Sequence, residues 1–550
     1  MMAINIRLAL VAAFFVLLAT VMCGRLVYLH IVEREFLQGQ GDARSVRAEM
    51  INAHRGMIRD FAGKPLAIST PVTSLWVNPK ELLTEADQIP MAATLLDVPV
   101  EKFRQRMVDN KNKTFVYLRR HMPPEVAERI LDEKIKGIHG QREYQRYYPA
   151  GEIASHIVGF TNIDDEGQEG IELAYNSWLR GEPGKKKVLK NLYGDVVRDI
   201  RPLVDAVPGK NLDLSIDLRL QYLAYRELKS AIKYYGAVSG SVVILDAHTG
   251  QILSLVNQPS YNPNNRLGLE LASIRNRAVT DVFEPGSTVK PFTVAVALES
   301  GLYQASSEID TSPGFIKVGS KTIPDPRNFG VLDLGGIIAH SSQVGTTKLA
   351  LSLDEYEIWS MFSAVGFGQP VGIGFPGERA GYLPNRRRWK DIERATFAYG
   401  YGFQVTPLQL AAAYQVIASG GIKREISLVK GGTGEARRVM SEATAESLKV
   451  MLHRVIDEGT GSRASIEDYS VAGKTGTVRK VGEAGYEDTR HMAFFAGMTP
   501  AKDPRLVGVV MINEPTSAEY GGGAIAAPVF SRVMQEALRL LNIPPLDEAA

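Results

Sequence analysis

One uninterrupted apolar stretch near the N-terminus constrains the fold of the whole chain. Leu8 to Cys23 reads LALVAAFFVLLATVMC, between Arg7 and Arg25. This core is slightly shorter than the roughly 20 residues of a spanning helix. Arg25 can extend its charged end to the membrane interface, so that Leu26–Leu29 lengthens the span. No later segment approaches 18 uncharged apolar residues, so we expect everything beyond residue 30 to lie on one side of a membrane.

Three interpretations of this stretch compete. A cleaved signal peptide needs a small-x-small cleavage site, and Ala19-Thr20-Val21 fits poorly. A lipoprotein would have a small residue before Cys23, where Met22 stands. A retained signal anchor fits best. The sequence therefore predicts a cytoplasmic tail at residues 1–7, a transmembrane anchor at 8–29 and an extracytoplasmic remainder.

Composition limits what the remainder can be. Apolar residues make up 45% of the 550 residues and charged residues 23%, which excludes a largely disordered or polytopic membrane chain. Lys and Arg (63) balance Asp and Glu (61), which gives no reason to expect a nucleic-acid partner. With Cys23 as the one cysteine, no intramolecular disulfide is possible and a Cys/His zinc site is nearly excluded.

Two regions follow the anchor. Residues 30–209 are rich in charge and poor in long apolar runs, with helical patterns at Lys80–Leu96 and Pro124–Lys136. We interpret them as an irregular α/β spacer domain. The turn signal Val207-Pro-Gly209 marks the boundary to a second domain at 210–543, and residues 544–550 form a C-terminal tail.

The second domain has strand patterns at both ends and helices between them. Asp217 caps a helix of periodic apolar residues, and the C-terminal helix is amphipathic. The expected strands are Leu212–Ile216, Ser241–Leu245, Gln251–Val256, His491–Ala496 and Leu506–Asn513, and the closing helix is Ala526–Leu541. This order predicts one large α/β unit around a mostly antiparallel sheet.

The strongest chemical signal is Glu284-Pro-Gly-Ser287-Thr-Val-Lys290. Pro285-Gly286 breaks the chain, and the residues up to Glu299 suit a helix. Ser287 and Lys290 are i and i+3, so they share one face. A desolvated, neutral lysine can take the proton of a serine nucleophile. Alone the motif is weak, because an N-cap serine with an exposed lysine is the commoner case.

A second motif is Val471-Ala-Gly-Lys474-Thr475-Gly476-Thr477-Val, which is typical of a strand. Alternation places Lys474 and Gly476 on one face and Thr475 and Thr477 on the other. Gly476 leaves room for another backbone, and a lysine with two hydroxyls suits a carboxylate. The alternative is a plain edge strand with a solvated lysine. Between the two motifs lies His340-Ser341-Ser342-Gln343, before an apolar helix.

This ordered set resembles the penicillin-recognising serine enzymes. The resemblance covers nearly the whole chain after the anchor and is most similar to the class B penicillin-binding proteins, in particular the division-specific peptidoglycan D,D-transpeptidases of the FtsI type. It rests also on the stretches Arg55-Gly56, Arg146-Tyr-Tyr-Pro149, His156–Gly159, Gly167–Glu172, Tyr399–Leu410, Lys474–Lys480 and Phe494–Pro500.

The resemblance implies a role for each matching residue. Ser287 would be the acylated nucleophile, Lys290 its base and Ser341 a proton relay. Lys474 would tune that network, Thr475 and Thr477 would hold the stem-peptide or β-lactam carboxylate, and the N–H groups of Ser287 and Thr477 would form the oxyanion hole. The candidate site residues are thus catalytic Ser287, Lys290, Ser341 and Lys474 and substrate-binding Gln343, Thr475, Gly476 and Thr477.

The same resemblance implies partners. Peptidoglycan stem peptides would be substrates and β-lactams inhibitors, with no metal or cofactor. A polytopic glycosyltransferase of the FtsW type and other division proteins would be partners at the cell inner membrane.

Two departures from the family pattern stand out. Gln343 replaces the usual Asn of the middle motif, and Asp60-Phe-Ala-Gly63 replaces Asp-Arg-Asn-Gly. Gln343 leaves open a catalytically weakened paralogue that acts as a scaffold. A β-lactamase or β-lactam sensor and an elongation-specific transpeptidase are further alternatives, although the first two lack a spacer domain.

Overall fold

The structure is a computed structural model that describes residues 2–37, 46–190, 196–432, 434–482 and 485–545. Most of the predicted C-terminal tail, residues 544–550, therefore lies outside the described residues. Contacts divide the chain into two compact units. Unit 1 comprises Met1–Arg55, Ser69–Gln145 and Arg180–Gly209, and unit 2 comprises Gly56–Ile68, Arg146–Leu179 and Lys210–Ala550.

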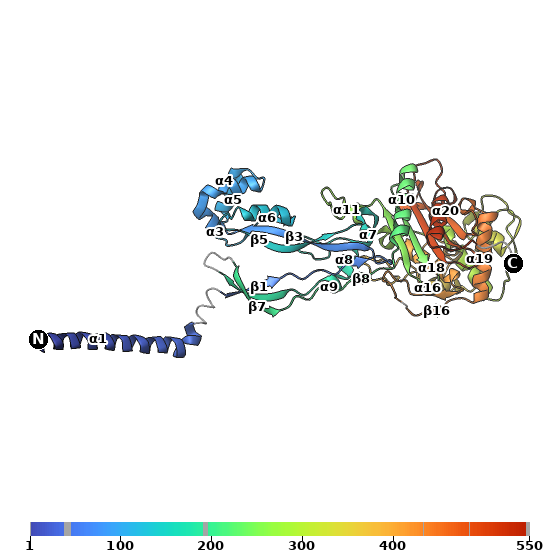
Figure 1. The fold of residues 1–550 in the computed structure, drawn as a ribbon. Coiled ribbons are helices and arrows are strands. Elements are labelled where there is room, and N and C mark those ends of the chain that lie inside the picture. Colours follow the sequence, from blue (N-terminus) through green and yellow to red (C-terminus); the bar gives the residue numbers. More distant parts are fainter. Residues whose placement is uncertain (1, 38–45, 191–195, 433, 483–484, 546–550) are drawn as a thin grey trace. The chain divides into compact units, whose positions relative to one another are not determined.

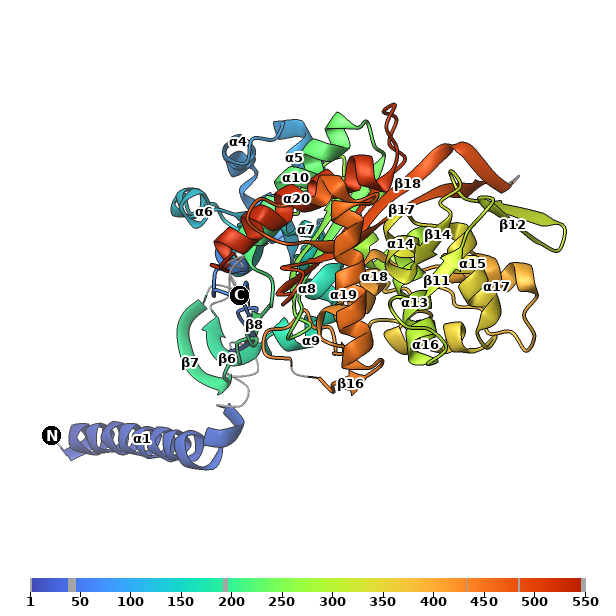
Figure 2. The ribbon, with the colours of Figure 1, turned by 90° about the vertical axis from the view of Figure 1, so that its right-hand side faces the viewer.

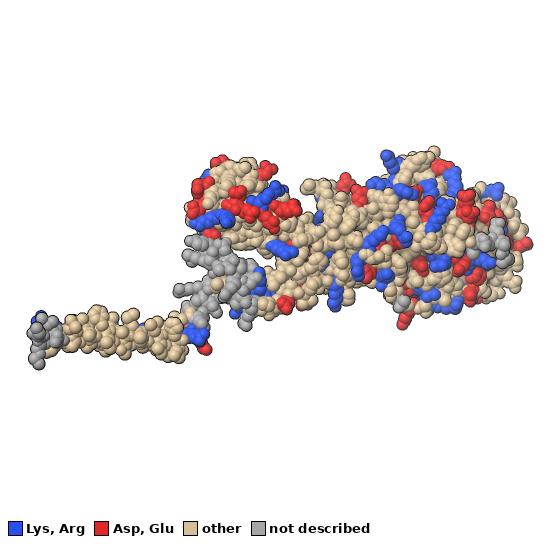
Figure 3. Space-filling view, in the orientation of Figure 1, with Lys and Arg blue, Asp and Glu red and all other residues tan. Residues whose placement is uncertain are grey.

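The N-terminal stretch is a single helix. Helix α1 spans Met2–Val27 and continues as a π-helical turn, η1, over Tyr28–Val32. Ile6–Val32 is long and apolar enough to cross a membrane, with a mean hydropathy of 2.5, and none of it is buried. Figure 3 shows the shaft of α1 without charged side chains between its two ends. The helix continues past Arg25, as expected for an anchor with an interfacial arginine.

Unit 1 combines two small sheets with short helices (Figure 1). Strands β1 (Val46–Ile51), β6 (Gly184–Lys190) and β7 (Val196–Val204) form one antiparallel sheet. Strand β3 (Pro65–Val77) pairs with β4 (Val116–Met122) and β5 (Ile138–Tyr147). The helices of this unit are α3 (Pro79–Leu82), η2 (Leu83–Gln88), α4 (Ile89–Leu95), α5 (Val100–Asp109) and α6 (Pro124–Asp132).

The helix expected over Lys80–Leu96 is broken into three pieces. Glu85 has non-helical backbone angles (φ −122°, ψ 58°), and Pro90 lies at the start of α4. A proline is tolerated in the first turn of a helix but not in its interior, so the sequence restarts the helix there. The apolar residues of this stretch are nevertheless buried: Leu82, Ile89 and Ala93 lie in the core of this unit.

Unit 2 contains two segments that the sequence analysis assigned to the spacer. Gly56–Ile68 and Arg146–Leu179 belong to this unit, although the boundary after Gly209 coincides with the predicted one. Their apolar side chains explain the difference, because Ile58, Ile157 and Ile171 lie in the same core cluster as the sheet. A buried ion pair between Arg146 Nε and Glu172 Oε1, at 2.6 Å, also lies inside this part. By contacts, these two segments therefore group with the sheet of unit 2 and not with unit 1.

The centre of unit 2 is a five-stranded antiparallel sheet in the order β10-β9-β19-β18-β17. These strands are β9 (Ser239–Asp246), β10 (Ile252–Gln258), β17 (Ala472–Gly482), β18 (Gly485–Thr499) and β19 (Leu506–Asn513). Four of the predicted strands are confirmed as β9, β10, β18 and β19, and so is the mostly antiparallel sheet. The fifth, Leu212–Ile216, is a strand only over Leu212–Asp213. Strand β17 forms one edge.

Helices cover both faces of this sheet (Figure 2). On one face, Val242 and Ile244 pack with α10 (Leu218–Tyr234) and α20 (Gly522–Leu540). On the other face, Val243 and Leu245 join the core formed with α13 (Lys290–Glu299), α18 (Pro407–Ala418) and α19 (Glu442–Asp457). Every residue of α18 is buried, which is typical of a helix at the centre of a large domain. The Asp217 cap of α10 is confirmed, since its side chain accepts from Arg219 N.

The remaining elements of unit 2 are short. Its helices are η3 (Gly151–Ile153), α7 (Ser155–Val158), α8 (Gly170–Ala174), α9 (Asn176–Leu179), α11 (Leu271–Ile274), α12 (Arg277–Thr280), η4 (Gly286–Val289), α14 (Leu334–Ala339), α15 (Gln343–Ser352), α16 (Glu357–Val365), α17 (Asp391–Ala398) and η5 (Ser462–Ala464). Its strands are β2 (Ile58–Arg59), β8 (Leu212–Asp213), β11 (Glu308–Asp310), β12 (Phe315–Val318), β13 (Lys321–Pro324), β14 (Val331–Asp333), β15 (Ile422–Lys423) and β16 (Arg437–Arg438).

Candidate active site

The serine of the first motif lies in a tight turn. Ser287 is half-buried in the 3-10 turn η4, which leads directly into α13 at Lys290. The backbone N–H of Lys290 donates to Ser287 O. Side chains three residues apart eclipse each other in a 3-10 turn. The turn therefore brings Ser287 and Lys290 to one face more directly than the predicted α-helix would.

Close backbone contacts fix this turn. Gly286 N–H donates to Gly400 O at 3.0 Å, and Gly400 has a left-handed φ of +96°. A Cβ on Gly400 would lie 2.1 Å from Gly286 O, so only glycine fits there. On the other side, the buried hydroxyl of Tyr414 on α18 donates to Thr288 O at 2.7 Å. The serine turn is held between a glycine turn and the central helix.

Glu284 attaches two further segments to the residue run that carries the serine. Its carboxylate accepts from Gly402 N at 2.8 Å and from the hydroxyl of Tyr486, on β18, at 2.9 Å. Tyr486 also packs edge to face against Tyr401. The outer end of the β17–β18 pair is thereby tied to the start of the serine turn.

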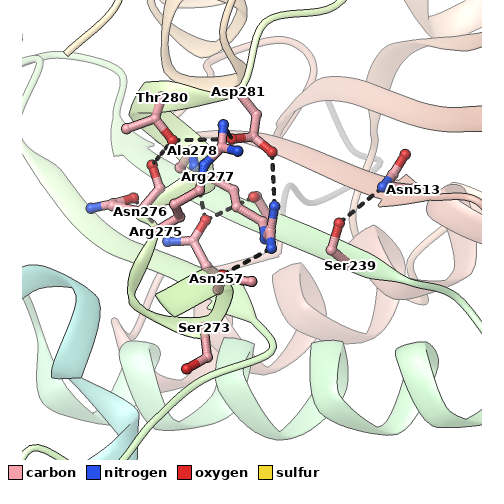
Figure 4. A network of polar contacts seen from close by, with 12 residues as sticks. Ser239, Asn257, Ser273, Arg275, Asn276, Arg277, Ala278, Thr280, Asp281 and Asn513 are labelled. Atoms are coloured by element: carbon pink, nitrogen blue, oxygen red, sulfur yellow. Dashed lines mark hydrogen bonds and ion pairs between the residues drawn. The ribbon is translucent and has the colours of Figure 1, made fainter. Parts of the chain in front are cut away.

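The segment before the serine turn rests on a buried polar network (Figure 4). Asn257 on β10 accepts from Ala278 N at 2.8 Å and donates to Asn276 Oδ1 at 2.8 Å. Asp281 pairs with Arg275 and Arg277 at the end of α12. These bonds fix α12 against the sheet, so the chain enters Glu284–Ser287 from a rigid base.

Lys290 is fully buried against the middle motif. Its Nζ donates to the backbone oxygen of Ser341 and, at 3.2 Å, to Ser341 Oγ. Burial lowers the pKa of Lys290 well below its usual value; the nearby Lys474 acts in the same direction and Asp325 in the opposite one. A neutral amine that lies beside a serine can accept the proton of the serine hydroxyl.

Asp325 organises the middle motif from a loop after β13. Its carboxylate accepts from Ser342 Oγ and Gln343 N, both at 2.5 Å, and from Val344 N at 3.2 Å. Ser342 in turn caps α15 by accepting from Gly345 N. A carboxylate at the N-terminus of a helix is favoured by the helix dipole. Asp325 thus fixes the backbone beside Ser341, which has a left-handed φ of +59°.

Gln343 is the first residue of α15 and is half-buried. Only its backbone takes part in the Asp325 contacts. Among the described residues, its side-chain amide forms no hydrogen bond with the catalytic candidates or with any other residue. The structure does not join this side chain to the Lys290–Ser341 pair.

The second motif lies on the edge strand β17 beside the serine turn. Lys474 is fully buried, and its Nζ donates to Thr475 O at 3.2 Å. Burial lowers its pKa to about 7. The alternative of a solvated lysine on an edge strand is therefore wrong, although β17 is an edge strand. A Cβ on Gly476 would lie 2.8 Å from Thr288 Cγ2 and 3.3 Å from the backbone oxygen of Pro285, so a side chain approaches Gly476 more closely than the expected backbone does.

The two threonines of this motif face the N-terminus of α20. Thr477 Oγ1 accepts from Gly522 N at 2.9 Å, and Thr475 Oγ1 shares a hydrogen bond with Thr460 Oγ1 at 2.6 Å. Gly522 approaches so closely that a Cβ would lie 2.4 Å from Gly476 O. Hydroxyls, a buried lysine and the positive end of a long helix together suit a carboxylate.

Sequence reasoning missed several residues of this site. Asp325, Tyr414, Thr460, Gly522 and Gly400 each support a motif from a distant part of the chain. The glycines before α20 and the Pro-Asp-Pro run around Asp325 were the available signals. Neither indicates by itself which motif it meets.

Comparison with known proteins identifies the architecture. The family described as penicillin binding protein transpeptidase domain matches residues 240–535, and the penicillin-binding protein dimerisation domain matches residues 50–214. The chain is 42% identical, over 543 residues, to the probable peptidoglycan D,D-transpeptidase PbpC of Pseudomonas aeruginosa. This match covers 98% of this chain and 96% of that protein. It is a class B penicillin-binding protein of the peptidoglycan D,D-transpeptidase family.

Other relatives agree with this assignment. The transpeptidase is 41% identical over 549 residues to the peptidoglycan D,D-transpeptidase FtsI of Escherichia coli K12, covering 98% of this chain and 93% of that one. The structure of penicillin-binding protein 3 from Mycobacterium tuberculosis, complexed with aztreonam, matches with a TM-score of 0.71 at 26% identity. That match covers 90% of this chain and 99% of that chain. The predicted family and fold class are confirmed.

Proposed function

We propose that this transpeptidase cross-links peptidoglycan stem peptides through an acyl-enzyme on Ser287. The observation that carries the proposal is the fully buried Lys290, which contacts both the backbone oxygen and the hydroxyl of Ser341 and follows Ser287 by one 3-10 turn. Burial favours the neutral amine that general-base chemistry needs.

The first half-reaction forms the acyl-enzyme. Lys290 takes the hydroxyl proton of Ser287 while Ser287 Oγ attacks the carbonyl carbon between the two terminal D-alanines of the donor stem. The carbonyl oxygen becomes an oxyanion, held by the N–H groups of Ser287 and Thr477. The C–N bond then breaks, and the departing D-alanine amine receives a proton through Ser341. Thr475 and Thr477 hold the donor's terminal carboxylate, and Lys474 supplies positive potential.

The second half-reaction transfers the acyl group. An amine of a neighbouring stem attacks the ester carbon, its surplus proton passes to the Lys290–Ser341 pair, and Ser287 regains its hydroxyl. A β-lactam would follow only the first half, leaving a stable ester on Ser287. The Mycobacterium tuberculosis relatives complexed with aztreonam and ampicillin support this expectation.

We assign α1 as a single-pass anchor in the cell inner membrane, with the catalytic unit in the periplasm. We assign the enzyme to septal synthesis beside a polytopic glycosyltransferase of the FtsW type. The 41% identity to FtsI of Escherichia coli supports the septal role. The relatives PbpC and PenA, whose names specify no septal role, are similarly identical, so elongation stays the alternative.

Labelling with a fluorescent penicillin and peptide mapping tests the chemistry. The full-length protein should bind one label per chain on Ser287, and Ser287→Ala should remove it without a change in Tm. Label on Ser341 or Ser342 would refute the assignment. Steady turnover of a chromogenic cephalosporin, in place of one stoichiometric burst, would favour a β-lactamase.

A second experiment tests the cellular role. Conditional depletion should block septation and give filaments if the enzyme is septal. Loss of cell shape without filaments would assign it to elongation. A protein that is needed for septation, but whose Ser287→Ala form supports it equally well, would be a scaffold.

A further inference from the structure

Unit 2 has a second cavity that shares no residue with the serine site. Its volume is about 520 Å³, within the range of small-molecule sites. It lies between the end of α16, the start of α18 and the short strand pair β15–β16. Three of its lining residues are cationic: Lys423, Arg424 and Arg437.

Two of these cations stand directly opposite each other. Lys423 of β15 and Arg437 of β16 are cross-strand partners in the antiparallel register. Like charges in that position destabilise a strand pair. Lys423 is also half-buried, with its Nζ only 3.0 Å from where a Cβ of Gly366 would lie. Burial lowers the pKa of Lys423, and Arg437 adds to that effect.

The three cations form no ion pair among the described residues. Within the described part of the chain, none of Lys423, Arg424 and Arg437 has an ion-pair partner within 4.0 Å. The Nε of Arg424 is buried, and none of the described residues accepts a hydrogen bond from it. The lining also contains Glu425 and Glu435, which are exposed, as is Arg437. The buried donor of Arg424 costs stability unless an acceptor satisfies it, and an anion between Lys423 and Arg437 would also relieve their repulsion.

The shape and charge of the cavity define the ligand. Its wall contains the apolar residues Val365, Val371 and Ala412 beside the three cations. Arginine forks bind phosphate and carboxylate oxygens bidentately, while lysine acts as a point charge. A phosphate monoester, with a charge of about −2, offers more charged acceptor oxygens to Lys423, Arg424 and Arg437 than one carboxylate does. We propose that this cavity binds a phosphate monoester carrying an apolar group.

The test uses the full-length protein in detergent and a phosphate-free buffer. Dissociation constants are measured by calorimetry for inorganic phosphate, glycerol 3-phosphate and dihexanoyl phosphatidic acid below its micelle concentration. All three should bind the same site, and the phosphatidic acid should bind tightest because of the apolar wall. Tightest binding of glycerol 3-phosphate would identify a soluble ester as the source and refute the apolar group. Absence of saturable binding for every probe would overturn the site.

Variants locate the binding. Lys423→Gln and Arg437→Gln should each weaken phosphate binding by roughly tenfold or more, the loss expected for a charge-assisted hydrogen bond. Lys423→Gln should also raise the Tm of the ligand-free protein, because it removes a like-charge pair. Lys233→Gln, the same change on the exposed end of α10, is the control and should leave the affinity unchanged.

Unchanged affinity in Lys423→Gln and Arg437→Gln, or an equal loss in Lys233→Gln, would show non-specific charge attraction. Penicillin acylation should stay at the wild-type rate in all these variants and reports that the fold is intact. Failure of the phosphate site would therefore leave the proposed transpeptidase chemistry untouched.

Discussion

Gly400→Ala should slow acylation of Ser287 by a mechanism visible in the structure. Gly400 has a φ of +96° and accepts from Gly286 N, the residue before the serine. The new Cβ would lie 2.1 Å from Gly286 O. Relief to a 3.0 Å contact needs a separation of about 0.9 Å between the Gly400 turn and the serine turn. Because Tyr414 holds Thr288 from the other side, part of this shift must fall on Ser287.

The magnitude has two parts. A side chain in the left-handed region costs about 1–3 kcal/mol of stability. The displacement acts on the reaction, since a misplacement of about 1 Å can cost about 10²-fold in rate. Gly402→Ala separates the two parts, because Gly402 has a φ of +81° and nothing within 4 Å of its would-be Cβ. It should lose comparable stability but acylate at close to the wild-type rate.

The assay is the second-order rate of fluorescent penicillin acylation, with Tm measured on the same samples. Gly400→Ala should acylate about 10²-fold more slowly than Gly402→Ala. Equal rates for the two variants would show that the Gly400 contact does not position the serine, and the reasoning would fail.

Three further predictions concern the lysines and their supports. Asp325→Asn should lower the free energy of unfolding by about 2–3 kcal/mol, measured by urea denaturation, because it weakens three hydrogen bonds at the start of α15; an unchanged value would contradict it. Burial lowers the pKa of Lys474 to about 7, so between about pH 7 and 10.5 the unfolded chain keeps a proton that the folded chain has lost, and stability should rise with pH there. Lys474→Met should flatten that rise in urea titrations at pH 7 and 9, and an identical slope would count against it. Gln343→Asn should acylate on the order of tenfold faster, because the shorter amide needs less ordering to reach the site; an equal or slower rate would show a site built around glutamine.

Local patterns were enough to predict much of the fold. The apolar runs of β9, β10, β18 and β19 and the Asp217 cap are short-range signals, and each formed where expected. The discontinuous unit was not predictable in this way. Gly56–Ile68 and Arg146–Leu179 join the transpeptidase core through buried residues such as Ile58 and Ile157, whose partners lie far along the chain. No local periodicity records such a partner.

In the candidate site too, local patterns located some residues and missed others. The motifs located Ser287, Lys290 and Lys474, because their spacing is local. Asp325 meets Ser342 and Gln343 from a loop 17 and 18 residues away, and Thr460 meets Thr475 from another. Those contacts depend on how the loops fold over the sheet edge, which spacing does not specify.

The two lysines illustrate why the geometry was needed to assign chemistry. Both are fully buried, and burial lowers the pKa of each. Lys290 contacts the hydroxyl of Ser341 and lies near the Asp325 carboxylate, whereas Lys474 donates to the backbone of its own strand. Lys474 also disfavours the charged form of Lys290, which adds to the effect of burial. This environment supports the proposed role of Lys290 as the base, because the base must be neutral before it can take a proton.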